Sequence, residues 1–158
     1  AEEIRESTYV EAAVILAIDG VVTDGDFDRQ ATEFFVPNDF VFRETAEYPE
    51  LLFGASVNPY RTDSLERLEK VVEQGAVLMK WLPSIQRIDP SDRSLIPFYE
   101  KLVEHNLPLI CHTGRERSFT HSDDSLADPM RLRLPLEIGV RVIAAHAEIG
   151  RASCRDRV

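Results

Sequence analysis

Short runs of apolar residues alternate along the chain with longer stretches whose apolar positions recur every three or four residues. The runs are rich in Val, Ile and Leu and are nearly continuous, instead of alternating with polar residues. Continuous runs of this kind are typical of parallel strands that are covered on both faces. We predict five strands, at Ala12–Ile18, Leu51–Val57, Ala76–Lys80, Leu107–Cys111 and Val140–Ala145.

Helical signals fill the segments between these runs. We predict helices from Asn38 to Glu47, from a cap at Thr62 or Asp63 to Gly75, from a cap at Asp92 to Asn106, and from Asp128 and Pro129 onward. Pro135 falls inside the last of these helices. Because proline lacks an amide hydrogen and clashes with the preceding turn, we expect a kink or a late start there.

Strands that alternate with helices at this spacing indicate βαβ units and a parallel sheet, so the fold class is α/β. Two architectures satisfy the pattern: a doubly wound sheet, or part of a (β/α)₈ TIM barrel. Periodicity alone does not choose between them. Both architectures place functional residues at the carboxyl ends of the strands, which directs attention to that edge of the sheet.

Composition narrows the possible partners. The chain has 158 residues with 18 Lys and Arg against 28 Asp and Glu, a formal net charge of −10. This acidic balance argues against a nucleic-acid or anionic-membrane surface, because both need clustered basic residues. No apolar run reaches the roughly 18 residues of a membrane span, and no signal peptide opens the chain. The two cysteines, Cys111 and Cys154, form no disulfide framework, so we expect a cytoplasmic protein.

Three residues that could bind a metal or a substrate end the last three predicted strands. Lys80, His112 and His146 follow successive apolar runs, so they should converge at one edge of the sheet. Strand alternation supports this picture, because it gives Lys80 the same face as Leu78, His112 that of Ile110 and His146 that of Ala144. Each residue alone has an ordinary interpretation, namely a lysine extending to solvent or a hydrogen-bonded structural histidine. Together, two histidines on neighbouring strands suit zinc or another divalent metal.

Several segments resemble a known group of enzymes. GAVLMKWLPSIQRIDP (75–90), LPLICHTG (107–114) and VRVIAAHAE (140–148) are similar to the amidohydrolase superfamily, specifically its amidohydrolase-related (type 2) metal-dependent hydrolases. SVNPYR (56–61) and VPND (36–39) also resemble that group. The resemblance extends from about Val10 to Ala147.

This resemblance implies a partial (β/α)₈ barrel, in which the five strands are numbers two to six. It implies a divalent metal, with zinc expected, bound by His112 and by His146, which could also act as the catalytic acid or base. Lys80 would take the place of a carboxylated lysine that bridges two metals. The His-x-His of the first strand and the Asp of the eighth are not found, so we expect the chain to be a truncated fragment that is inactive alone.

A small organic molecule is the substrate that the resemblance implies, with cleavage of a C–N or C–O bond. Trp81, Asn58 and Tyr60 lie just past strand ends and could line its pocket, although ordinary loop packing is the alternative for each. Thr113 could contact substrate or orient His112. The full-length enzyme could form a homo-oligomer.

Other functions remain open at this point. A non-oxidative decarboxylase of the same superfamily would share the site. A Schiff-base lyase would use Lys80 as its nucleophile. A binding module would carry no catalysis at all.

The last eleven residues, EIGRASCRDRV (148–158), do not continue the pattern. They differ only at Asp156 from a peptide that arises when a short-read sequencing adapter is translated. We therefore interpret 148–158 as a non-native tail and 1–147 as the partial barrel domain.

Overall fold

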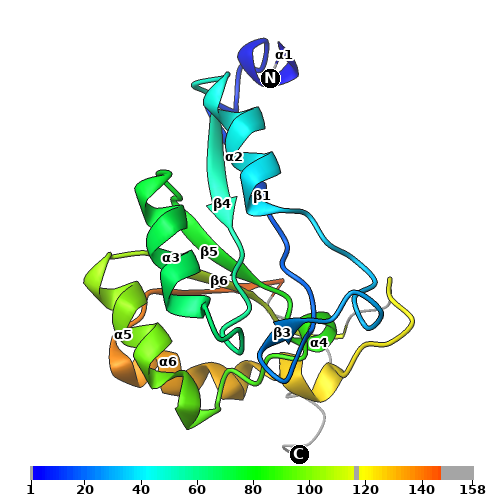
Figure 1. Cartoon of the computed structure of the whole chain (residues 1–158). Helices are drawn as coiled ribbons and strands as arrows, with labels where there is room; N and C mark the ends of the chain where they lie inside the picture. The colour runs from blue at the N-terminus through cyan, green and yellow to red at the C-terminus, as the bar shows by residue number, and fades with distance from the viewer. Residues whose placement is uncertain (1, 116–117, 147–158) are drawn as a thin grey trace, which may run out of the picture.

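The computed structural model of the chain describes residues 2–115 and 118–146, and the proposed tail at 148–158 lies outside them. Within these residues the fold is α/β, with five parallel strands in one sheet whose spatial order follows the sequence (Figure 1). The strands are β1 (Ala13–Leu16), β4 (Leu51–Ala55), β5 (Leu78–Trp81), β6 (Leu109–His112) and β7 (Val142–Ala145). All five predicted strands are therefore confirmed, each shorter than its apolar run.

The helices lie between the strands and cover one face of the sheet, as expected for βαβ units. The longer ones are α2 (Asn38–Ala46), α3 (Ser64–Glu73), α5 (Ile96–Glu104) and α6 (Arg133–Ile138). The shorter ones are α1 (Glu2–Arg5), α4 (Pro83–Gln86), η1 (Arg93–Leu95), η2 (Asp124–Ala127) and η3 (Pro129–Leu132). An antiparallel pair, β2 (Val22–Thr23) and β3 (Asp26–Phe27), lies between the first predicted strand and the first predicted helix.

The predicted fourth helix starts late. The Asp128 carboxylate accepts a hydrogen bond from the Met130 amide and caps the 3₁₀ turn η3, whose first residue is Pro129. The α-helical conformation begins only at Arg133. Pro135 is then the third residue of α6, where its missing amide hydrogen costs little, because the first-turn amides have no acceptor within a helix.

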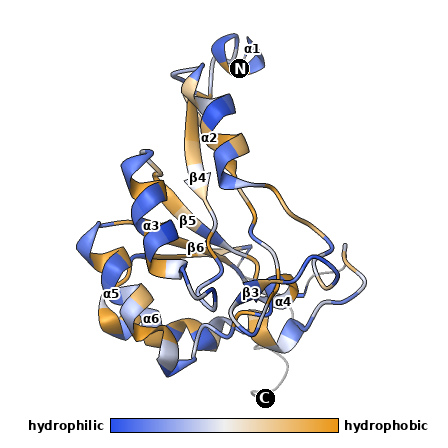
Figure 2. Cartoon of the chain, viewed as in Figure 1, coloured by the Kyte–Doolittle hydropathy of each residue, from blue (hydrophilic) through white to orange (hydrophobic). Residues whose placement is uncertain are grey.

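The two faces of the sheet differ in burial. On the helix side, Phe53, Met79, Trp81, Leu109 and Cys111 are each at most 4% exposed and belong to one core cluster. The opposite face carries further apolar side chains, so the strands in Figure 2 are mostly hydrophobic, with Lys80 in β5 and His112 in β6 as polar exceptions. On that face Val14 and Leu52 are each 37% exposed and Ile143 is 47% exposed.

This exposure differs from the burial on both faces that the continuous apolar runs indicated. The physical reason is that β1 and β7 are the two edges of an open sheet and do not pair with each other in the described part of the chain. The arrangement is consistent with part of a TIM barrel and does not form a closed one. No helix among the described residues is long and apolar enough to cross a membrane.

The asymmetry of the sheet predicts unequal costs for two matched substitutions. Leu109→Ala should lower the free energy of unfolding by about 2–5 kcal/mol, because Leu109 is fully buried on the helix side. Leu52→Ala should cost less than about 1 kcal/mol, since that side chain is partly in solvent on the open face. Urea unfolding followed by circular dichroism measures both, and equal losses would contradict the assignment of the two faces.

Candidate functional site

The carboxyl ends of β5, β6 and β7 bring the predicted metal-binding residues to one edge of the sheet. Lys80 lies in β5 and is 5% exposed, whereas His112 is the last residue of β6 and is 9% exposed. His146 follows β7 directly and is solvent-exposed. The imidazole rings of His112 and His146 have centroids 4.8 Å apart and are tilted by 54°.

Lys80 and His112 reach the open face of the sheet as strand alternation predicts. Lys80 of β5 is in register with Ile110 of β6. His112 lies two residues after Ile110 in β6, so the three side chains share a face of the sheet. The same reasoning was wrong for His146. Ala144 is in register with Cys111, which lies in the core on the helix side.

The backbone, and not strand alternation, directs the His146 ring toward His112. His146 has a φ of 69°, in the left-handed region, so the chain leaves the extended conformation at this residue. The regular strand pattern ends at Ala145, one residue before His146. Histidine is among the non-glycine residues that adopt this conformation more readily, so the residue type gave a weak signal.

Thr113 links the two histidine-bearing strands. Its amide nitrogen lies 3.2 Å and its Oγ1 2.9 Å from the carbonyl oxygen of Ala145, and both donate to it. Ala145 immediately precedes His146, and Thr113 immediately follows His112. Thr113 therefore connects the backbone after His112 to the backbone before His146. Its predicted roles, contact with substrate or orientation of His112, stay predictions.

The spacing of the two imidazole rings can be compared with that of two histidines bound to one metal ion. With Zn–N bonds of about 2.0 Å and tetrahedral angles, two histidine rings on one zinc have centroids about 5 Å apart. The observed 4.8 Å agrees with this value. Among residues 2–115 and 118–146, however, no group of three or more His, Cys, Asp or Glu side chains is arranged to hold a metal. The described part of the chain thus brings two histidines together at this edge, and their role as metal ligands stays a prediction.

Two of the residues predicted to contact substrate serve the fold in this structure. Trp81 is fully buried, donates its Nε1 hydrogen to the Val57 carbonyl at 2.9 Å, and packs against the rings of Phe98 and Tyr99. Tyr60 donates its hydroxyl hydrogen to Asp92 at 2.9 Å. Burial, together with this hydrogen bond, raises the pKa of Tyr60 to about 12. Neither placement adds support to a substrate contact, which stays a prediction.

Asn58, the third such residue, lies in a buried polar network at the ends of β1, β4 and β5. Its Nδ2 donates to the carbonyls of Gly20 and Gln86, and its Oδ1 accepts from the Tyr60 amide. The Nε2 of Gln86, in α4, donates a hydrogen bond to the carbonyl oxygen of Asp19. The side chain of Asn58 is fully buried, so its polar groups are engaged by the protein itself.

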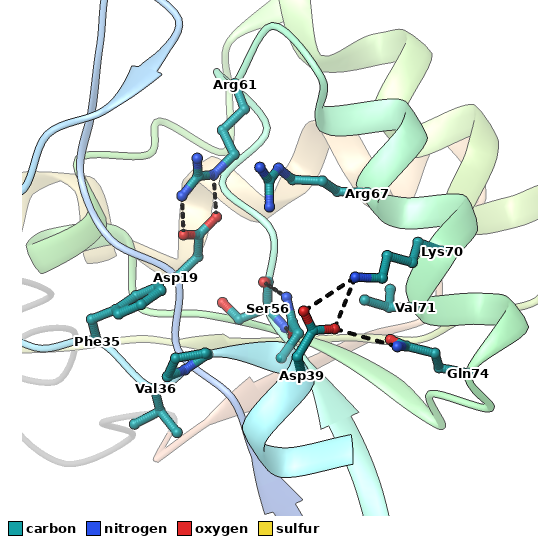
Figure 3. A pocket seen from close by; sticks show the side chains of 12 residues that line it. Asp19, Phe35, Val36, Asp39, Ser56, Arg61, Arg67, Lys70, Val71 and Gln74 are labelled. Atoms are coloured by element: carbon teal, nitrogen blue, oxygen red, sulfur yellow. Dashed lines mark hydrogen bonds and ion pairs between the residues drawn. The ribbon is translucent and has the colours of Figure 1, made fainter. Parts of the chain in front are cut away.

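The strongest electrostatic contact of this network joins Asp19 to Arg61. The Arg61 Nε and Nη2 donate to the two Asp19 carboxylate oxygens at 2.7 and 2.6 Å, and both side chains are less than 10% exposed (Figure 3). Asp19 also accepts from the amides of Gly20 and Asn58. Neither Arg61 nor Gln86 is among the site residues predicted from the sequence. Arg61 stands in the SVNPYR segment, but neither its type nor its position predicts a buried partner 42 residues earlier.

Cys111 has no catalytic environment. It lies in the core beneath the sheet, where burial raises the pKa of its thiol to about 12, so it remains protonated and unreactive near neutral pH.

A family model described as an amidohydrolase matches residues 7–156. The chain belongs to the amidohydrolase family. No curated protein matches the sequence significantly. Amidohydrolases form part of a superfamily of hydrolases that generally depend on metal, which accords with paired histidines at the strand ends. The match also enters the segment 148–158, and the interpretation of that segment as a non-native tail stays a prediction.

The buried ion pair predicts a second stability contrast. Asp19→Asn leaves the Arg61 guanidinium buried without a counter-charge, so we expect the amidohydrolase domain to lose about 3–5 kcal/mol of unfolding free energy. Asp63→Asn, which breaks an ion pair whose two side chains are 46% and 42% exposed, should cost no more than about 1 kcal/mol. Urea unfolding at constant ionic strength compares the two, and a cost for Asp19→Asn as small as that of Asp63→Asn would refute the structural role of the pair.

Proposed function

We propose that the chain is part of a metal-dependent hydrolase that activates water to cleave a C–N or C–O bond in a small organic substrate. The observation that carries the proposal is the close approach of His112 and His146 at the carboxyl edge of the sheet, within a domain of the amidohydrolase family. The ring spacing of 4.8 Å suits two ligands of one divalent ion, and imidazole nitrogen favours zinc.

The two histidines have different surroundings and therefore different roles in this proposal. His112 is buried at the end of β6, so it is the ligand held most rigidly. His146 is exposed, so substrate and solvent can reach its imidazole. It is either the second ligand of the metal or, in place of that role, the group that passes a proton to the leaving group. A divalent ion bound here would polarise the scissile carbonyl and lower the pKa of its water to about 7.

Lys80 is a conditional third ligand. An ammonium group has no lone pair to give, so Lys80 could bind a metal only as a carbamate. Its burial at 5% exposure on the open face of β5, the same face as His112, is compatible with that role. Thr113 would maintain the distance between the histidines by its two hydrogen bonds to the Ala145 carbonyl.

Two alternatives lead to different products or adducts. A non-oxidative decarboxylase would release carbon dioxide from the same site, so analysis of products from carboxylated and amide substrates separates it from a hydrolase. A Schiff-base lyase would form a covalent bond to Lys80. Borohydride treatment in the presence of a carbonyl substrate, followed by mass spectrometry of the peptide 75–90, would reveal such an adduct and refute the metal-based proposal.

The metal proposal predicts the behaviour of single histidine variants. His112→Ala and His146→Ala should each weaken zinc binding by the 158-residue chain at least about tenfold, because each removes one of two imidazole ligands. His121→Ala is the control, since that imidazole is 73% exposed and lies near Glu33 instead. Titration calorimetry with zinc measures the three affinities. If His121→Ala weakened binding as much as His112→Ala, the site would not be the one proposed.

A further inference from the structure

Residues 118–123 form a strap that extends from the loop after β6 toward the far side of the sheet (Figure 1). In the spatial order β1-β4-β5-β6-β7, two strands separate β6 from β1. The strap nevertheless contacts Glu33 and Phe34, which lie between β3 and α2. Val36, two residues after Phe34, pairs with Ile18 just after β1. The strap therefore spans the carboxyl edge of the sheet from the end of β6 toward the end of β1.

The loop that carries the strap is anchored beside the predicted metal site and at the end of β5. The Gly114 amide, two residues after His112, donates to the carbonyl oxygen of Ala127 at 3.0 Å, which closes the base of the loop. The Asp123 amide donates to the carbonyl oxygen of Ser84 at 2.9 Å, and Ser84 lies in α4, just past β5. The loop thus leaves the sheet next to His112 and crosses the strand ends from there.

One carboxylate holds the middle of the strap. The Oε2 of Glu33 accepts a hydrogen bond from the Thr120 amide at 3.0 Å, and its Oε1 accepts one from the His121 amide at 2.8 Å. Thr120 and His121 are exposed, and the Glu33 side chain is 30% exposed. Hydrogen bonds to an ionised acceptor are stronger than those between neutral groups, so this pair fixes the position of the strap.

An aromatic contact lies beside the carboxylate. The rings of Phe34 and Phe119 have centroids 5.8 Å apart and are tilted by 44°. Phe34 remains 44% exposed, so the contact removes only part of its apolar surface from water. Segments held by exposed backbone hydrogen bonds and partly exposed side chains open locally at small cost. The strap can therefore detach while the core of the domain stays folded.

Gly114 gives the loop a hinge. Its φ of 95° lies in the region that favours glycine, and the missing Cβ lets the backbone reach other torsion angles as well. We propose that the strap is a lid over the strand ends that bear His112 and His146, and that the Glu33 carboxylate is its latch. Release of the two amides from Glu33 opens this edge to solvent and substrate. The role of the lid in catalysis rests on the proposed function, whereas access to His112 is measurable without a metal.

Amide hydrogen exchange followed by NMR tests the latch. In Glu33→Ala the Thr120 and His121 amides should exchange at least about tenfold faster, because both lose a charged acceptor. Glu33→Gln keeps a side-chain oxygen at the same reach and should give an intermediate rate. Asp92→Ala is the matched control, since Asp92 accepts the Ser94 amide at 2.8 Å outside the strap. It should leave exchange at Thr120 and His121 unchanged.

Diethyl pyrocarbonate tests the lid, because it modifies accessible imidazoles and mass spectrometry gives the rate at each histidine. His105 is the internal reference, since it lies at the end of α5 beside Glu69 of α3. In Glu33→Ala the ratio of modification at His112 to that at His105 should rise at least about threefold, as local opening exposes the edge. In Asp92→Ala the ratio should keep its wild-type value.

Three outcomes would overturn the proposal. The first is slow exchange of the Thr120 and His121 amides that persists in Glu33→Ala, which would deny Glu33 its role as latch. The second is faster exchange with an unchanged ratio of His112 to His105 modification, because the strap would then cover no part of the site. The third is a rise of that ratio in Asp92→Ala as large as in Glu33→Ala.

Discussion

The buried carboxylate of Asp19 is the group on which the carboxyl edge of the sheet depends. It accepts hydrogen bonds from the amides of Gly20 and Asn58 and from two nitrogens of Arg61. A carboxylate at 5% exposure would be very unfavourable without these donors. The loop after β4 must therefore lie against the end of β1, where its Asn58 and Arg61 contact Asp19. Gln86, which follows β5, donates a hydrogen bond to the Asp19 carbonyl and so holds the end of β5 at the same place. These contacts join the ends of β1, β4 and β5 at one buried point.

Much of the fold could be predicted from local sequence patterns. Each strand and each helix must bury its own apolar side chains, so the five apolar runs and the helical periodicities between them mark these elements directly. Caps such as Asp128 and the late start caused by Pro135 follow from local backbone chemistry. The network around Asp19 could not be predicted in the same way. Its long-range contacts join residues 28 to 67 positions apart, and no periodicity encodes which buried polar group meets which.

The candidate site shows the same contrast between residues whose placement follows from local pattern and residues whose placement depends on distant neighbours. Lys80 and His112 were placed on the correct face because they lie within regular strands, where side chains alternate. Asn58 and Trp81 follow or end strands as substrate-contacting residues often do, yet their polar groups complete the interior. Position at a strand end thus indicates proximity to the site, whereas the direction of the side chain depends on neighbours that only the tertiary structure supplies.

The left-handed backbone of His146 has a consequence for which residues this position can accept. A β-branched side chain there would cost on the order of 1–2 kcal/mol or more in backbone strain, whatever its chemistry. Asparagine, aspartate and glycine adopt the conformation readily, and the first two are also able to bind a metal. The torsion therefore limits this position to residue types that tolerate a left-handed backbone, whatever function the side chain serves.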